Sequence, residues 1–217
     1  MPTSRFERFL PLAGVLTGLL FLAAFFLSGP EPGVGDPAKQ LTWLKDHQGA
    51  ANLGGFAAAY SVVTLLFFAA GIRQILRSGE SGESTYSSAA FAGGLLLATA
   101  TAVSAVSVLA AAEAANKDNA AVVQTIGYLA DYSWIPWIAG AAVLFLATGL
   151  GGLRTARLPK WLSILTVVLG VLCLLGPAGI AVYFVSPLWL IATGLIMSRR
   201  ASTRPPATAQ VPAPALV

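Results

Sequence analysis

The sequence predicts an all-α integral membrane protein, a polytopic bundle of six transmembrane helices with both termini in the cytoplasm. Of its 217 residues 56% are hydrophobic and only 10% are charged, whereas soluble domains carry about 25% charged residues. The mean hydropathy is +0.75. Long apolar stretches recur along the chain, and the basic residues stand in small groups beside them. Because so few charges could not cover the surface of a water-soluble fold of this length, the composition predicts the membrane class.

Six apolar segments are expected to cross the bilayer, whose hydrocarbon core of about 30 Å needs roughly 17–25 residues per helix. They are residues 10–27, 53–76, 89–112, 132–153, 161–175 and 180–197. The last two come from one apolar stretch, Leu162–Met197, which is too long for a single span. A Gly-Pro-Ala-Gly sequence at residues 176–179 divides it into a close helical hairpin, because Gly and Pro favour a tight turn. The fifth span is short, and Lys160 and Trp161 could anchor its start at the interface.

The first span could instead belong to a cleaved signal peptide, since Arg5 and Arg8 precede it. Its apolar stretch is longer than the usual 7–15 residues, and no A-x-A pattern follows it. A retained signal anchor is therefore the expectation.

The distribution of basic residues predicts the orientation. With six spans, ten of the 13 Lys and Arg residues lie on the side of the two termini, and only Lys39, Lys45 and Lys117 lie on the other side. The positive-inside rule then places both termini in the cytoplasm. An odd number of spans would put Arg199 and Arg200 on the wrong side, so six is the consistent count.

The two outer loops are expected to contain helix. Asp36 suits a helix N-cap and Pro37 the first helical position, which predicts a short helix lying on the outer leaflet. Residues 122–130 have apolar side chains at helical spacing and could extend the fourth span outward. Pro136 would then kink this longer helix near the interface.

Two cytoplasmic segments look polar and irregular. Residues 78–88 are rich in Gly and Ser and are expected to be mobile. Residues 201–217 are rich in Pro and Ala and are expected to form a disordered tail. Residues 1–200 would then form a single transmembrane bundle.

The centres of the expected spans contain no Asp, Glu, Lys, Arg or His. Charged groups inside a membrane are costly and usually functional, so their absence argues against proton relays, voltage sensors and pumps that use buried carboxylates. The third span is instead rich in Gly, Ala, Ser and Thr, which suits close helix packing, contact with a membrane-protein partner or a second copy, or a polar-lined path. Tyr60, Thr99 and Ser104 are the candidate ligand-binding residues for such a path.

The only other candidate site is a polar cluster expected at the outer face, made of His47, Glu113 and Asp131. One His and two carboxylates could bind a metal or act as acid and base. The spacing matches no metal motif, however, and each residue also suits a solvated helix end. The sequence therefore predicts no bound metal and no cofactor. The single cysteine, Cys173, excludes an intramolecular disulfide, and the scattered basic groups do not suggest nucleic-acid binding.

Residues 148–162 end one span and begin the next with Arg154, a small residue, Arg157 and then Leu-Pro-Lys-Trp-Leu. This pattern resembles a family of small six-span bacterial membrane proteins, common in actinobacteria, that is classed as a domain of unknown function. Asn52-Leu53-Gly54, the Leu-Leu-Gly-Pro at residues 174–177 and Pro187-Leu188-Trp189 fit the same pattern. The resemblance implies a multi-pass protein of the bacterial cytoplasmic membrane and assigns no catalytic residues.

Three functions remain open at this point. The charge-free spans favour a non-enzymatic accessory or structural membrane component. A small transporter of an apolar or neutral solute would use the hydroxyl groups of the second and third spans. A lipid-active enzyme would use His47, Glu113 and Asp131 at the outer face.

Overall fold

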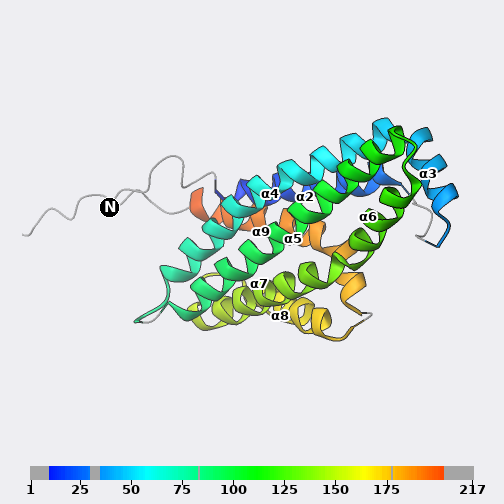
Figure 1. The fold of residues 1–217 in the computed structure, drawn as a ribbon. Coiled ribbons are helices and arrows are strands. Elements are labelled where there is room, and N and C mark those ends of the chain that lie inside the picture. The colour runs from blue at the N-terminus through cyan, green and yellow to red at the C-terminus, as the bar shows by residue number, and fades with distance from the viewer. Residues whose placement is uncertain (1–9, 30–34, 83, 177, 203–217) are drawn as a thin grey trace, which may run out of the picture.

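The computed structural model describes residues 10–29, 35–82, 84–176 and 178–202, and within them every regular element is a helix. Figure 1 shows the helices α2 (Leu12–Ser28), α3 (Pro37–Asp46), α4 (Gln48–Arg77), α5 (Thr85–Asn116), α6 (Ala120–Tyr132), α7 (Trp134–Thr155), α8 (Lys160–Leu174) and α9 (Ala178–Ser202). The prediction of an all-α bundle is therefore confirmed. The tail expected at residues 201–217 lies outside the described residues, apart from the last two backbone positions of α9.

Six of the helices form a closed ring in chain order. Each of α2, α4, α5, α7, α8 and α9 packs on the next, and α9 packs back on α2. The hairpin of α8 and α9 is more open than expected, because α8 packs mainly on α7 while α9 packs mainly on α2. The turn between them lies at Gly176 as predicted, with a φ of 59° that favours glycine.

Four candidate spans are long and apolar enough to cross a membrane: α4, α5, the continuous stretch of α6 and α7, and α9. Helix α4 has 30 residues and α5 has 32, so at a rise of about 1.5 Å per residue both exceed a hydrocarbon core of about 30 Å. Helices α2 and α8 are apolar but shorter, with 17 and 15 residues. Four helices of this length and composition suggest a helical membrane protein.

The expected helical extension of the fourth span is present as α6. It joins α7 at Ser133, whose backbone stays in the right-handed helical region, so the two helices form one bent rod. Pro136 has no N–H and so cannot donate to the carbonyl of Tyr132, four residues earlier. This missing hydrogen bond accounts for a bend between α6 and α7. The bend lets α6 turn onto α3 and α5.

Helix α3 begins as the sequence predicts. Asp36 caps it by accepting a hydrogen bond from the Lys39 backbone N–H at 3.1 Å, and Pro37 takes the first position. Leu44 is buried in a second, alanine-rich core together with Ala112, on α5, and Val123, on α6. The apolar face of this helix is therefore covered by α5 and α6, and its expected position at the outer leaflet stays a prediction.

The polar segment at residues 78–88, expected to be irregular, contains the first turn of a helix and several local hydrogen bonds. Helix α5 already begins at Thr85. The Glu80 carboxylate accepts hydrogen bonds from the backbone N–H and hydroxyl of Ser87, at 2.9 and 2.6 Å, and so caps the start of α5. Arg157 donates to the carbonyl of Ser78 at 2.6 Å. Local capping and one long-range bond therefore hold a segment that was expected to be mobile.

Aromatic side chains fill the middle of the ring. Trp189 contacts the rings of Phe145 and Phe68 edge-on, with centroids 4.6 and 5.9 Å apart. Its indole N–H donates to the Thr166 hydroxyl at 2.8 Å. All four residues are buried, so this aromatic layer of Phe68, Phe145 and Trp189 links α4, α7, α8 and α9 across the interior.

Glycines allow the helices to approach this closely. A Cβ placed on Gly93 would lie 2.4 Å from the Leu144 backbone nitrogen, and one on Gly140 would lie 2.5 Å from the Leu97 backbone nitrogen. Where α5 crosses α7, Gly93 of α5 therefore lies against α7, and Gly140 of α7 lies against α5. Dense packing of the third span through its small residues is confirmed, and these residues are used within the chain.

We expect Gly93→Ala to lower the free energy of unfolding by about 2 to 3 kcal/mol, since the added methyl meets a backbone that cannot move aside. In a chain of this size this corresponds to a melting temperature lower by roughly 5–10 °C in detergent. Gly49→Ala is the matched control, because a Cβ at Gly49 meets nothing within 4 Å. Equal melting temperatures for the two variants would contradict the close crossing of α5 and α7.

Candidate functional site

A half-enclosed cavity of about 320 Å³ lies inside the half of the ring that is next to α6. Side chains from α2, α4, α5, α7 and α9, together with the end of α6, line it. None of the lining residues is Asp, Glu, Lys, Arg or His. The lining is aromatic, small or hydroxyl-bearing, so the cavity suits a molecule without charge.

An aromatic cluster forms the wall where α2, α7 and α9 meet. The ring of Tyr183 lies 4.6 Å from that of Trp137 and 4.8 Å from that of Phe25, measured between centroids. Phe184 stands beside Phe25 at 5.8 Å and is largely exposed at the rim. These rings give a ligand flat apolar surfaces, and such contacts contribute beyond simple burial.

The lining also includes three hydroxyl groups, those of Thr101, Ser104 and Ser133. Ser104 donates to the hydroxyl of Ser133 at 3.0 Å, which ties α5 to the bend between α6 and α7. Ser133 in turn donates to the Ala130 carbonyl at 2.7 Å, and Thr101 donates to the Leu97 carbonyl at 2.9 Å. Because these donors are used within the protein, this part of the lining mainly offers oxygen lone pairs to a ligand.

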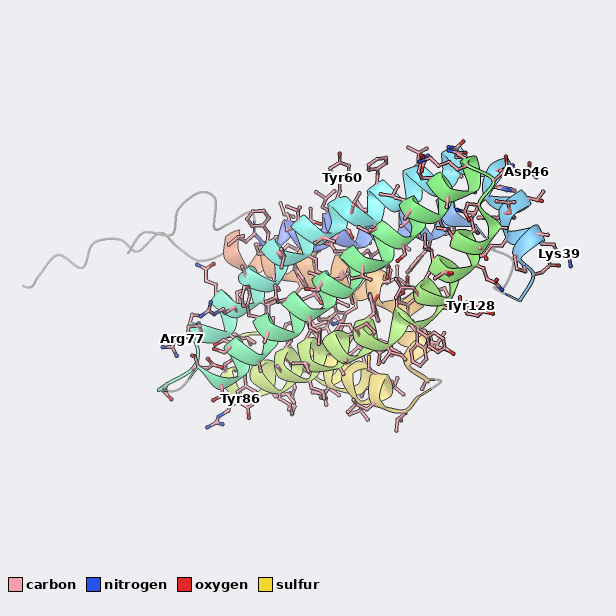
Figure 2. The ribbon with its side chains drawn as sticks, in the orientation of Figure 1. Lys39, Asp46, Tyr60, Arg77, Tyr86 and Tyr128 are labelled. Atoms are coloured by element: carbon pink, nitrogen blue, oxygen red, sulfur yellow. The ribbon has the colours of Figure 1, made fainter. Side chains whose placement is uncertain are left out.

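Of the three candidate ligand-binding residues, only Ser104 reaches the cavity. Tyr60 is 66% exposed and points away from the bundle, as Figure 2 shows. Thr99 is exposed and donates to the Leu95 carbonyl of its own helix. The expectation that Tyr60 and Thr99 line a path through the bundle is therefore corrected, since both face outward.

The polar residues that were expected to cluster at the outer face do not form a metal site among the described residues. His47 stacks on Trp43 with ring centroids 4.7 Å apart, and its Nδ1 lies 2.9 Å from the Trp43 carbonyl. Glu113 pairs with Lys117 at 2.9 Å, and this hydrogen bond and charge lower the pKa of its carboxyl. Asp131 is exposed near the end of α6. Across the described ranges, no three His, Cys, Asp or Glu residues are placed to hold a metal ion.

Sequence reasoning missed most of the residues around the cavity. Trp137 resembles an interfacial anchor in the sequence, but it is 3% exposed and packs against Tyr183. Ser133 stands in the sequence as one more polar residue near a span end. The signal for Trp137 is helical spacing. Trp137, Ile138 and Ala141 share one face of the helix, and all three are buried.

Comparisons of the chain with models of protein families, with curated proteins and with solved structures gave no match. The geometry of the cavity and the charges at the two ends of the bundle therefore carry the functional argument.

Proposed function

We propose that the chain crosses the cytoplasmic membrane of a bacterium six times, with both ends in the cytoplasm. Helices α2 and α8 would be the two spans added to the four long ones, because both stand in the ring beside them. At about 1.5 Å per residue they cover roughly 22–26 Å, and flanking residues such as Lys160 can make up the difference. The bacterial location follows from the resemblance carried by residues 148–162.

The separation of charges supports this orientation. Arg157 donates to the Ser78 carbonyl at 2.6 Å, and Arg200 donates to the Arg157 carbonyl at 3.1 Å, so the ends of α4, α7 and α9 meet. Lys45 forms an ion pair with Asp118 at the other end of the bundle. Figure 2 shows the same contrast between Arg77 and Lys39. By the positive-inside rule the arginine end faces the cytoplasm.

We further propose that the protein binds a small, uncharged and mainly apolar molecule from the outer side, without changing it chemically. The observation that carries this proposal is the outer cavity, whose lining comes from five ring helices and holds no charged side chain. Its volume of about 320 Å³ is at the lower end of the range for ligand pockets, which favours a small ligand. The Tyr183 hydroxyl has no hydrogen-bond partner within the described residues and could donate to the ligand.

This binding role is better supported than a docking role or a lipid-active enzyme. A membrane-protein partner or second copy docked through the third span would need its small residues at the surface, whereas Gly93 and Gly94 face α7 and α4. A lipid-active enzyme would need His47, Glu113 and Asp131 to converge, whereas each is exposed and the first two have local partners. Transport remains compatible with the cavity but would require the aromatic layer around Trp189 to open.

Labelling of single cysteines tests the six-span topology. In a Cys173→Ala background, we expect Ala121→Cys and Leu175→Cys to react with a membrane-impermeant maleimide in spheroplasts, because both positions are exposed and would lie outside. Ser81→Cys, on the exposed cytoplasmic loop, should react only after permeabilisation. Protection of Leu175→Cys until permeabilisation would show that α8 does not cross the membrane.

Filling the cavity tests the binding role. Purified protein in detergent should gain thermal stability on addition of naphthalene, an uncharged apolar probe, because a ligand that binds only the folded state raises the melting temperature. Ala58→Leu places a larger side chain in the cavity and should abolish this gain. Ala59→Leu is the matched control, since Ala59 is equally half-buried but does not line the cavity. Equal gains in all three proteins would overturn the proposal.

A further inference from the structure

Three buried hydroxyl groups in the inner half of the ring have no hydrogen-bond partner within the described residues. They belong to Thr148 on α7, Ser163 on α8 and Thr193 on α9. Each of the three residues is 0% exposed. A buried polar atom without a partner loses its hydration with no compensation, so such groups in native proteins call for an explanation.

Other buried hydroxyls of the bundle are satisfied in a simple way. Thr17 donates to the Ala13 carbonyl, and Thr166 to the Leu162 carbonyl, both at 2.7 Å. A Ser or Thr in a helix always has such a carbonyl one turn before it. The side chains of Thr148, Ser163 and Thr193 leave this bond unmade and are therefore available to a partner outside their own helices.

The three hydroxyls lie at one level of the bundle. Thr148 follows Phe145 by three residues, and Thr193 follows Trp189 by four. Ser163 precedes Thr166 by three residues on α8, which runs in the opposite direction. Positions three or four apart share a helix face. Since Trp189 contacts both Phe145 and Thr166, each hydroxyl lies one turn further inward on the same interior faces.

The crossing of α7 and α8 brings two of them close together. A Cβ on Gly152 would lie 2.5 Å from the Ser163 hydroxyl oxygen, and one on Gly149 would lie 2.8 Å from the Ser163 carbonyl. Ser163 therefore contacts the α7 backbone at Gly149 and Gly152, which lie in the helical turn that follows Thr148. Because Gly149 and Gly152 have no side chains, α8 approaches α7 closely enough for Ser163 to lie within one turn of Thr148.

We propose that Thr148, Ser163 and Thr193, the hydroxyl layer, bind a water molecule enclosed between α7, α8 and α9. A buried water makes about three hydrogen bonds, and three hydroxyls each supply a donor and an acceptor. A cation would lack a countercharge, because the ring interior carries no carboxylate at this level, and an apolar ligand would leave the hydroxyls unpaired. The site is separate from the outer cavity, with Trp189 between them, and does not depend on the proposed ligand.

Removing the hydroxyls one at a time and together tests the site. We expect Thr148→Val, Ser163→Ala and Thr193→Val each to lower the melting temperature in detergent, by roughly 2–4 °C. These decreases in melting temperature should be strongly non-additive, because the first substitution already releases the water. The triple variant should therefore show a smaller decrease than the sum of the three single decreases.

The control is Ser107→Ala, whose buried hydroxyl donates to the Val103 carbonyl of its own helix at 2.9 Å. Its effect should add to that of any hydroxyl-layer variant without coupling. Unchanged or raised melting temperatures for the three single variants would mean dry, unpaired hydroxyls and would overturn the proposal. Strictly additive losses would also overturn it, because they exclude a shared ligand. The stabilisation by naphthalene should persist in all these variants, so the outcome is independent of the outer cavity.

Discussion

The close approach of helix backbones at glycines is the constraint on which the rest of the structure depends. Lipid tails are as apolar as the side chains they surround, so helices in a membrane gain little from hydrophobic burial and associate through tight contact. Gly93 and Gly140 provide that contact between α5 and α7, and Gly18 provides it between α2 and the Pro187 carbonyl of α9. Side chains at these positions would separate the helices and widen the ring around Trp189.

The ring interior alternates between apolar and hydroxyl-bearing levels and carries no charge. The outer cavity with Ser104 lies above the aromatic layer, and the hydroxyl layer lies below it. Burying a hydroxyl in such surroundings costs far less free energy than burying a charge, because a neighbouring backbone carbonyl or one water molecule can satisfy its hydrogen bonds. Under the proposed binding role, an interior of this kind would recognise an uncharged molecule by its shape and by single hydrogen bonds.

Composition and the Gly and Pro residues at turns predicted the helices well. The contacts between segments far apart in the chain could not be predicted from the sequence. The bounds of α2 and α8 differ by only one or two residues from the expected spans, because apolar length and the turn at Gly176 are local properties. Tyr60 and Thr99 were misplaced because both faces of a membrane helix can be apolar, so periodicity does not reveal the inner face. Glu80 was missed as a cap because its partner, Ser87, lies seven residues further along.

The closure of α9 onto α2 has a consequence for how the protein is made. These two helices are the first and last of the ring to leave the ribosome, yet each supplies the other with a packing surface at Gly18 and Gly194. During synthesis α2 therefore lacks part of its packing surface until α9 has been made. A chain cut short before α9 would keep this face of α2 uncovered.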